Sequence, residues 1–498
     1  MKIWNLITLL SALIIFQANA DSIPAKATYT EKYRPRYHYT PANRWMGDPS
    51  GLIKHKGKYR AYNWGASESE DLVHWKELNT HSIIGVPKGI STFTGSTVVD
   101  KENTAGYGKD AMIAVFTMFD NESKKQAQAI SFSNDGGETF HYYDRNPVLD
   151  IWSTEFRDPT VIYDQQTQRW IMVVAKALEK KVAFYASKNL KDWEWLSDFG
   201  PLGDADRSWE CPDLFRLPVD GNRDNMKWVL LVSVNWAREQ YFIGDFNGKE
   251  FIAETPEAYP LYVDQGLDYY ASRVFQNYDE PDAPVYTMGW VCTWDYANQQ
   301  PSEWGKGIWS IPREYSLRST PSGLRLYQTP LPALEKLRGN PYKMNKAIKA
   351  GITPLKEVAK MDNSYEMRVD FEVRDGAPVG LNLCQGKGRK VMISYDPQSK
   401  HLTLYRDGVT DADIPKFERI AMTKVMPVGN HLLLDVFVDK ATIEIFVNDG
   451  EAVMTALTYP GEGQNEASIF TLSPQTRVNM TVWPLASIWT DSSSLTSQ

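Results

Sequence analysis

Short apolar runs separated by polar turn residues dominate the first two thirds of this 498-residue chain. Typical runs are residues 111–116 (AMIAVF), 170–175 (WIMVVA) and 228–233 (WVLLVS), and Gly, Asp, Asn and Pro lie between them. Runs of this length with turn residues at both ends are typical of buried strands, and long stretches with helical periodicity are absent. We therefore expect an all-β fold from residue 37 to about residue 337.

A short motif recurs within this region. A Ser is followed two positions later by Asp or Asn, and then by an aromatic residue, at residues 69–75 (SEDLVHW), 133–140 (SNDGGETF) and 187–193 (SKNLKDW). Such a motif forms a tight turn between two strands, and its spacing suits the four-stranded blades of a β-propeller. Recurring hairpins in a β-sandwich are the alternative that this pattern alone leaves open.

The sequence changes character after Pro330. Residues 339–351 contain several Lys and Asn residues and suggest a linker, whereas residues 352–490 again alternate apolar and polar positions. Within the latter, Asn448-Asp449-Gly450 is a strong signal for a tight hairpin. We predict a propeller domain at residues 21–338 and a β-sandwich at residues 352–490.

Residues 1–20 have the features of a secretory signal peptide. Lys2 precedes an apolar run at residues 3–16, and small residues stand at positions 18 and 20. The run is too short to span a bilayer, and no other segment is apolar enough to cross one. Because no Cys lies near the cleavage point, we expect a secreted or periplasmic protein rather than a lipid-anchored one.

Charge and composition narrow the range of partners and cofactors. The net charge is −8 and no long Lys/Arg cluster occurs, which argues against a nucleic-acid partner. The seven His and three Cys are scattered, so we expect no metal site, no cofactor and no disulfide framework. The 17 Trp and 26 Tyr suit β-rich cores, but aromatic faces also stack on sugar rings.

Three carboxylates stand in short turns bounded by aromatic residues and Pro. The turns are residues 45–51 (WMGDPSG), 156–159 (FRDP) and 209–213 (WECPD). Pro fixes φ and Gly permits unusual φ, so each turn can hold its carboxylate in one orientation. Because loops from different blades converge on the channel of a propeller, Asp48, Asp158 and Glu210 can meet in one pocket. Three acids held this way suit acid, base or nucleophile chemistry on a neutral substrate.

These turns and four further motifs resemble glycoside hydrolase family 32, which contains invertases, inulinases and levanases. The further motifs are residues 93–96 (FTGS), 289–294 (GWVCTW), 310–314 (SIPRE) and 446–451 (FVNDGE). The resemblance covers nearly the whole chain after the signal peptide. It implies a five-bladed β-propeller followed by a C-terminal β-sandwich.

The resemblance also implies catalytic roles. Asp48 would be the nucleophile that attacks the anomeric C2 of a terminal fructosyl unit. Glu210 would protonate the leaving oxygen and later deprotonate water, and Asp158 would bind sugar hydroxyls and stabilise the cationic transition state. This sequence of steps is a retaining double displacement.

Further residues are expected to bind the sugar. Arg157 adjoins Asp158, and Cys211 is expected to pack or form a hydrogen bond beneath Glu210. Asp213 and Asp268 are candidates for the pocket rim, and a turn or salt-bridge role is equally open for both. The candidates for the fructose-binding wall are Trp45, Trp64, Phe93, Thr94 and Trp294.

The chain departs from the family pattern near the first acid. Gly47 and Ser50 stand where the family usually has Asn, and the loop before Ser69 is short. These changes leave open whether cleavage occurs at chain ends or internally.

We expect an exported enzyme that releases terminal fructose from levan, inulin or sucrose, so that its partner is a fructan polysaccharide or sucrose. An endo-acting levanase and a fructan-binding protein without catalysis are the alternatives. A sialidase is a weaker one, because residues 133–140 resemble the Asp turn of that fold but its arginine trio and Tyr nucleophile cannot be identified.

Overall fold

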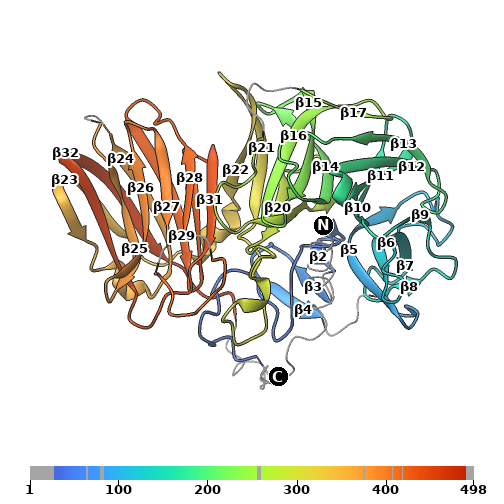
Figure 1. Ribbon diagram of the computed structural model, residues 1–498, viewed down its shortest axis with the longest axis horizontal. Coiled ribbons are helices and arrows are strands. Elements are labelled where there is room, and N and C mark those ends of the chain that lie inside the picture. Colours follow the sequence, from blue (N-terminus) through green and yellow to red (C-terminus); the bar gives the residue numbers. More distant parts are fainter. Residues whose placement is uncertain are drawn as a thin grey trace, which may run out of the picture.

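The computed structural model describes residues 27–62, 65–78, 83–254, 260–373, 376–406, 408–417 and 419–489. They form two β-rich domains that lie side by side, a propeller drawn in blue to yellow and a sandwich drawn in orange to red (Figure 1). Besides strands, the described residues contain the short 3-10 helices Ala177–Glu179, Ala297–Gln299, Pro332–Leu337 and Val358–Met361. The all-β prediction is confirmed. In this part of the chain, no helix has the length and apolar character needed to cross a membrane.

The propeller has five blades of antiparallel strands. The first contains β1 (Ile53–His55), β2 (Lys58–Ala61), β3 (Ala66–Ser69) and β4 (Trp75–Leu78), with β19 (Gln276–Asn277) alongside β1. The second contains β5 (Ile90–Asp100), β6 (Ala111–Asp120), β7 (Gln126–Ser133) and β8 (His141–Tyr142), and β9 (Leu149–Ser153) also pairs with β7. The third contains β10 (Phe156–Asp164), β11 (Arg169–Lys176), β12 (Lys181–Ser187) and β13 (Glu194–Phe199). The fourth contains β14 (Trp209–Val219), β15 (Asn222–Val234), β16 (Arg238–Phe246) and β17 (Phe251–Ala253). The fifth contains β18 (Tyr270–Val274), β20 (Val285–Trp290), β21 (Arg313–Thr320) and β22 (Gly323–Pro330).

The recurring Ser motif forms the turn between the third and fourth strands of a blade. In the first blade, the N–H of Asp71 donates to Ser69 Oγ (3.3 Å), and Asp71 Oδ1 accepts two further backbone N–H groups (2.9 and 2.8 Å). Ser187 and Asn189 repeat this arrangement in the third blade (3.1, 3.0 and 2.9 Å). Ser133 begins the corresponding turn between β7 and β8. The side chains supply acceptors that the turn backbone lacks, so the sequence repeat is a repeat of propeller blades.

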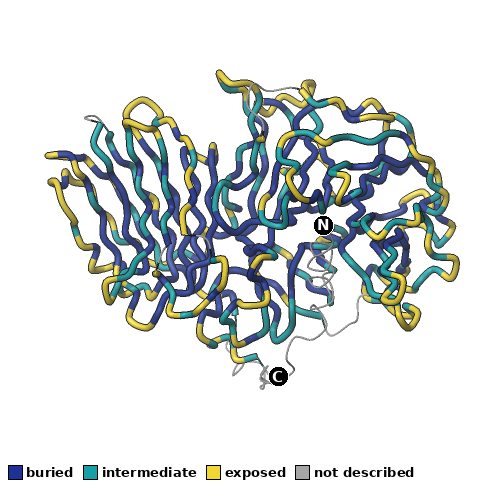
Figure 2. The backbone as a smooth tube through the Cα atoms, in the orientation of Figure 1, coloured by how far each residue is buried: buried dark blue, intermediate teal, exposed yellow. Residues whose placement is uncertain are grey.

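Apolar side chains between neighbouring blades form the propeller core. Ile113, Val115 and Ile130 of the second blade are buried against Phe156 and Val161 of the third. Figure 2 shows the strands of both domains largely in dark blue and many of the turns in yellow. Burial of each such side chain stabilises the fold by about 1.5–3 kcal/mol, so packing between blades contributes strongly to the stability of the propeller.

Four inner strands carry a β-bulge close to their first residues. The pairing register shifts at Thr92/Gly95 in β5, Arg157/Thr160 in β10, Glu210/Asp213 in β14 and Tyr270/Arg273 in β18. In three of these bulges a non-Gly residue adopts a left-handed φ, which is 65° at Asp158, 48° at Cys211 and 53° at Ala271. A bulge interrupts the regular alternation of side chains, so each strand can direct an additional side chain towards the channel.

The C-terminal domain is a β-sandwich around one apolar core. Its strands are β23 (Tyr342–Pro354), β24 (Ser364–Glu372), β25 (Val379–Gly386), β26 (Arg389–Asp396), β27 (His401–Tyr405), β28 (Ile420–Lys424), β29 (His431–Asp439), β30 (Thr442–Val447), β31 (Ala452–Leu457) and β32 (Glu466–Pro484). The first part of β32 pairs with β25 and the second part with β24, so one long strand connects the two halves of the sandwich.

The connector expected at residues 339–351 is mostly strand. β23 pairs with β32 from Tyr342 to Pro354. Met344 and Ile348 are the buried residues of this strand, and most of its other side chains are exposed. A strand that faces water in this way has the composition of a linker, which explains the difference from the prediction.

Buried charges connect the two domains. Arg313 of β21 contacts Glu444 of β30 (2.5 Å) and Asp264 (3.1 Å), and His38 contacts Glu444 (2.9 Å) and Asp439 (2.8 Å). Burial opposes the charge of His38, but the two carboxylates together raise its pKa to about 9. The chain is thus tied to the sandwich before it enters the first blade.

Candidate active site

The three predicted acids lie together at one site. Asp48 lies just before the first blade, Asp158 in the bulge of β10, and Glu210 near the start of β14. Asp48 Oδ2 accepts a hydrogen bond from Thr94 Oγ1 (3.0 Å). The Cys211 thiol lies 3.7 Å from Asp48 Oδ2 and 3.6 Å from Asp158 Oδ2, and the Cys211 N–H donates to Asp158 Oδ2 (3.1 Å). Cys211 therefore packs between the two aspartates. Because it directly follows Glu210, it places that residue next to them.

Arg157 and Tyr270 hold both oxygens of Glu210. Arg157 Nε and Nη2 lie 2.9 and 2.8 Å from Glu210 Oε1, and the Tyr270 hydroxyl donates to Glu210 Oε2. The remaining guanidinium nitrogen of Arg157 donates to Glu155 (2.7 Å) and Gln126 (3.1 Å). The carboxyl of Glu210 is therefore fixed in one orientation.

A second buried guanidinium lies beneath the acids. Arg273 is 2% exposed, and its Nη2 donates to the Asp158 carbonyl oxygen (3.3 Å). It also donates to the Pro212 carbonyl oxygen (3.3 Å) and to Thr160 Oγ1. This arginine joins the bulges of β10 and β14 and adds positive charge below the pocket.

The site raises the pKa values of its aspartates. Burial and then the charges of Asp158 and Glu210 raise the pKa of Asp48 to about 7, against a lowering by the Thr94 hydrogen bond. Burial raises the pKa of Asp158 to about 6, although Arg157 opposes this shift. Burial also raises the pKa of the Cys211 thiol well above its usual range, so this side chain is a neutral packing group rather than a nucleophile.

Two groups of packed rings contain three of the predicted aromatic candidates. Trp45 stacks on Trp294 with ring centroids 6.1 Å apart, and Trp290 packs edge-on against both (6.1 and 4.9 Å). Phe93 stacks on Phe119 at 4.7 Å. Trp45, Phe93 and Trp294 are all partly exposed, so each can offer a ring to a ligand. Trp64 lies outside the described residues.

Gly47 and Ser50 both have partners in the turn around Asp48. The Gly47 carbonyl oxygen accepts the indole N–H of Trp309 (2.8 Å). Ser50 Oγ donates to the Gly95 carbonyl oxygen (3.2 Å) and accepts the Gly95 N–H (3.1 Å). A hydroxyl that donates and accepts in this way ties the Asp48 turn to β5.

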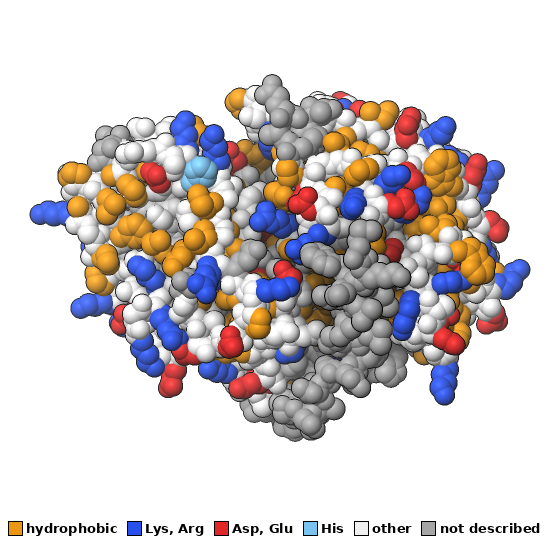
Figure 3. All heavy atoms as spheres, in the orientation of Figure 1, with side chains coloured by type: hydrophobic (Ala, Val, Ile, Leu, Met, Phe, Trp, Pro, Cys, Tyr) orange, Lys and Arg blue, Asp and Glu red, His pale blue; other side chains and the backbone are white. Residues whose placement is uncertain are grey.

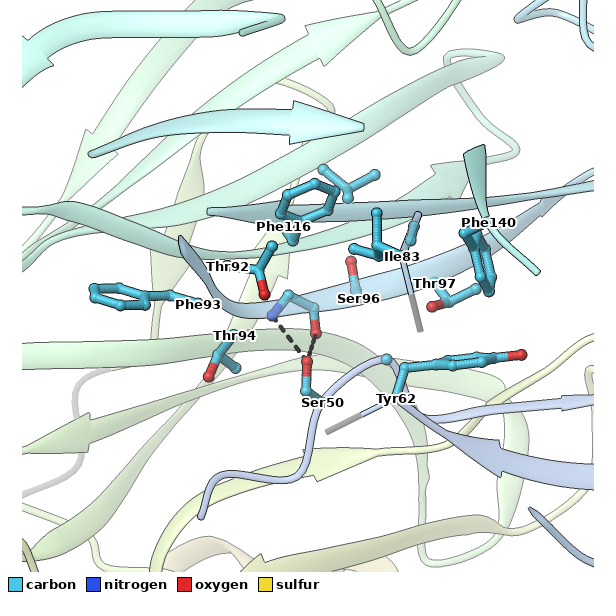
Figure 4. Close-up of a pocket in the computed structure, with 14 residues that line it drawn as sticks. Ser50, Tyr62, Ile83, Thr92, Phe93, Thr94, Ser96, Thr97, Phe116 and Phe140 are labelled. Carbon is cyan, nitrogen blue, oxygen red and sulfur yellow. Dashed lines mark hydrogen bonds between the residues drawn. The ribbon is translucent and has the colours of Figure 1, made fainter. Parts of the chain in front are cut away.

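A cavity between the first two blades adjoins the acids. Figure 4 shows Ser50 and Tyr62 on one side and Thr92, Ser96 and Thr97 on the other. Thr94 lines this cavity and also contacts Asp48, whereas the three acids do not line it. The cavity is therefore a neighbour of the acid site, separated from it by the Thr94 side chain.

Two rim candidates are buried structural residues. Asp213 is 3% exposed and accepts the N–H groups of Leu214 (2.9 Å) and Val274 (2.8 Å), which joins β14 to β18. Asp268 is fully buried and pairs with Arg406 of the sandwich (2.5 Å). Both aspartates connect parts of the fold instead of lining the pocket, because each is aimed at backbone or at the second domain.

Two further observations concern possible metal ligands and the distribution of charge on the surface. Within the described residues, no group of three or more His, Cys, Asp or Glu side chains is placed to hold a metal ion. On the face drawn in Figure 3, positive and negative side chains are interspersed rather than gathered by sign. The arrangement that stands out chemically is the carboxyl trio with its two guanidinium groups.

Tyr270 and Arg273 are the functional candidates that sequence reasoning missed. They follow Asp268 and Tyr269 in a run with ordinary strand character, so only the β18 bulge brings their side chains to Glu210 and Asp158. The unusual backbone at Ala271 leaves no clear signal in the sequence.

Comparisons with known proteins agree with this geometry. The chain matches the family description "Glycosyl hydrolases family 32 N-terminal domain" at residues 38–330 and "Glycosyl hydrolases family 32 C terminal" at residues 333–484. It is 34% identical to a levanase of Bacillus subtilis, over 98% of this chain and 75% of the relative. It is 32% identical to a levanbiose-producing levanase of the same organism, over 90% of this chain and 89% of the relative.

Solved structures show the same architecture. The exo-inulinase of Aspergillus awamori superimposes with a TM-score of 0.84 at 27% identity, covering 93% of this chain and all of that one (100%). A β-fructofuranosidase of Schwanniomyces occidentalis complexed with fructosyl-erythritol gives a TM-score of 0.81 at 27% identity, covering 94% and 100%. The chain belongs to glycosyl hydrolase family 32 and is a glycoside hydrolase.

Proposed function

We propose that this β-fructosidase removes terminal fructose from fructans, with levan or inulin as the main substrates and sucrose as a short one. The observation that carries the proposal is the meeting of Asp48, Asp158 and Glu210 at one site, with Glu210 held by Arg157 and Tyr270. The relatives include proteins named levanase, exo-inulinase and invertase, which supports β-fructosides as the substrate class.

In the first step, Asp48 attacks the anomeric C2 of the fructosyl unit while Glu210 gives its proton to the leaving oxygen. The C2–oxygen bond breaks, and the fructosyl unit becomes an ester of Asp48. In the second step, the Glu210 carboxylate takes a proton from water, the water oxygen attacks C2, and Asp48 leaves as a carboxylate. The configuration at C2 is retained, as expected for a double displacement between two carboxyl groups.

Asp158 and the arginines act on the charge that develops during both steps. The transition state resembles an oxocarbenium cation, and a buried carboxylate nearby lowers its energy strongly because little water screens it. Asp158 is 4% exposed and is held by the N–H of Cys211, so its position is fixed before the sugar binds. Arg157 keeps Glu210 aimed at the leaving oxygen.

We infer that the enzyme acts outside the cytoplasm. The support is the signal-like sequence at residues 1–20 and a relative named extracellular exo-inulinase. These first residues lie outside the part of the chain that the structure describes.

Product analysis tests the proposal. The purified protein is incubated with levan, inulin and sucrose, and the products are separated by chromatography, with Asp48→Asn as the inactive control. Free fructose as the first product supports exo action, whereas a ladder of oligosaccharides supports an endo-levanase. Tight fructan binding without any product, unchanged in Asp48→Asn, would leave a binding protein as the better description.

A further inference from the structure

Trp152 has an unusual conformation and an unusual exposure for its residue type. It lies in β9 with a left-handed φ of 61°, and 79% of its surface is exposed. A bulky side chain rarely adopts this backbone conformation, and an exposed indole loses the stabilisation that burial would give. Such a combination persists where the neighbouring structure enforces it.

The neighbours hold the indole in place and leave it accessible. The Trp152 N–H donates to Asp150 Oδ1 (2.6 Å), and Asp150 Oδ2 pairs with Lys125 Nζ (3.2 Å). The same ammonium lies 3.5 Å from the centroid of a Trp152 ring. One face of the indole is therefore covered by a cation, while the high exposure leaves the other face to solvent.

A short series of contacts connects the strand that carries Trp152 to Glu210. Ser153, the next residue, pairs with Gln126, and Gln126 Oε1 accepts a hydrogen bond from Arg157 Nη1 (3.1 Å). Arg157 in turn holds Glu210. β9 also continues almost directly into β10, which carries Arg157 (Figure 1). The β9–β10 connection therefore links Trp152 to the proposed acid.

We propose that Trp152 is a stacking platform for a sugar unit of the leaving group, beyond the bond that is cleaved. This inference rests on the proposed function, because Glu210 protonates the leaving oxygen and the departing chain must therefore lie on its side of the pocket. Sugar rings present apolar C–H faces that stack on indoles, and Lys125 can bind their hydroxyls. Gln126 and Arg157 intervene between the indole and Glu210, so Trp152 takes a later unit rather than the first.

Truncation of the indole tests this platform. Trp152→Ala is expected to lower kcat/KM on long levan or inulin about tenfold and to leave kcat/KM on sucrose within about twofold, because sucrose has no later unit. Trp152→Phe, which keeps an aromatic face, is expected to retain most of the activity on long chains. An equal loss on sucrose and fructan, or no loss on fructan, would overturn the platform.

A matched control is the exposed Trp195 of β13, which is 56% exposed and bonds Asp198 through its Nε1 (3.1 Å). Trp195→Ala is expected to leave both substrates unaffected, and a loss equal to that of Trp152→Ala would mean a general surface effect. Failure of the proposed function has a different signature, since the wild-type protein itself would then release no fructose from any of these substrates.

Discussion

At the residue scale, the balance of charge around Asp48 governs the proposed chemistry. The carboxyls of Asp48, Asp158 and Glu210 outnumber the two nearby guanidinium groups, Arg157 and Arg273. Burial and this excess of negative charge raise the pKa of Asp48 to about 7 and that of Asp158 to about 6. Asp48 is therefore partly protonated near neutral pH, and it must lose that proton before it can attack C2.

The rate of hydrolysis should fall on the acidic side of this range. Below a pH of about 7 Asp48 gains a proton, so the carboxylate that attacks C2 is lost. We expect kcat/KM on sucrose to fall about tenfold for each further pH unit towards acid. The measurement is a pH profile of kcat/KM, and a flat profile from neutral pH well into acid would contradict the raised pKa of Asp48.

Asp48→Asn should abolish turnover and stabilise the fold at alkaline pH. The folded pKa of Asp48, about 7, exceeds its ordinary value of 3.8, so its ionisation costs folding free energy. This cost is fully present above the folded pKa and vanishes as pH falls below the unfolded one; at about 1.4 kcal/mol per pKa unit, it reaches about 4 kcal/mol at most. Thermal melting of both proteins should show a gain at alkaline pH that shrinks in acid. A gain that is independent of pH would mean that Asp48 is not strained by its charge.

Glu210→Ala should lose about 10²- to 10⁴-fold in kcat on fructan, because the leaving oxygen no longer receives a proton. Added azide should restore part of the rate on a substrate with an activated leaving group, since azide can attack the Asp48 ester without a general base. The matched control is Glu155→Ala, which removes another carboxylate partner of Arg157 (2.7 Å) but keeps the acid. No rescue of Glu210→Ala, or an equal loss in the control, would count against the acid/base role.

The three acids of this site could be predicted from the sequence. Asp48, Asp158 and Glu210 stand in turns whose Pro and Gly residues restrict the backbone, and such local constraints can be read from residue types. Tyr270 and Arg273 could not be recognised in the same way. Their positions depend on a bulge in β18, which no residue type announces, and on contacts with strands far away in sequence.

At the element scale, the bulge in β18 depends on a buried Ser–Glu pair. Ser233 Oγ accepts the Ala271 N–H (3.1 Å) and donates to Glu239 Oε2 (2.9 Å), which also accepts the Ser272 N–H (3.0 Å). The pair thus satisfies two N–H groups that the bulge removes from the regular ladder. Through them it fixes Tyr270 against Glu210.

Ser233→Ala should therefore lower kcat several-fold and leave KM little changed, because Tyr270 loses its fixed position while the sugar wall stays intact. It should also destabilise the protein by about 1–3 kcal/mol, since a buried N–H loses its acceptor. The control is Ser131→Ala on β7, whose buried hydroxyl has no hydrogen-bond partner among the residues that the structure describes. Steady-state kinetics and thermal melting check both variants, and equal effects in the two would contradict the role of the bulge.

Strands whose side chains are mostly exposed to solvent, such as β23, were the hardest elements to predict. The Ser-Asp and Ser-Asn turns of the blades could be recognised because their side chains replace backbone acceptors within a few residues. β23 could not, because its pairing with β32 joins positions more than a hundred residues apart while its own composition is that of a linker.

At the scale of the whole molecule, the two domains form one unit through buried charge. Arg313 is fully buried between Asp264 and Glu444, and Glu444 also bonds His38. Removing one member of such a network leaves the others charged without compensation in a dry interface. The interface is therefore stable only as a complete set.

Arg313→Met should destabilise the protein by about 3–5 kcal/mol, because it removes the guanidinium that two buried carboxylates share. The control on the same strand is Arg318→Met, whose guanidinium lies over the Tyr327 ring (4.3 Å) near solvent and should cost much less. Thermal melting distinguishes them, and similar melting temperatures for the two variants would show that the network contributes little.

The fold class followed from periodicity and repeats, which are local signals summed over many strands. The contacts between the domains could not be predicted in this way. His38, Arg313 and Glu444 are buried in the structure, but nothing in the sequence distinguishes them from exposed charged residues. Asp268 shows the same difficulty, since its pairing with Arg406 spans both domains.

The bulges of the inner strands have a consequence for how the pocket can change. Four of the five blades have one irregular position near the start of the inner strand, and the strand pairing resumes beyond it. The blade that carries Thr94 contributes a neutral hydroxyl there, so its position can diversify in evolution or in the laboratory with the least electrostatic penalty.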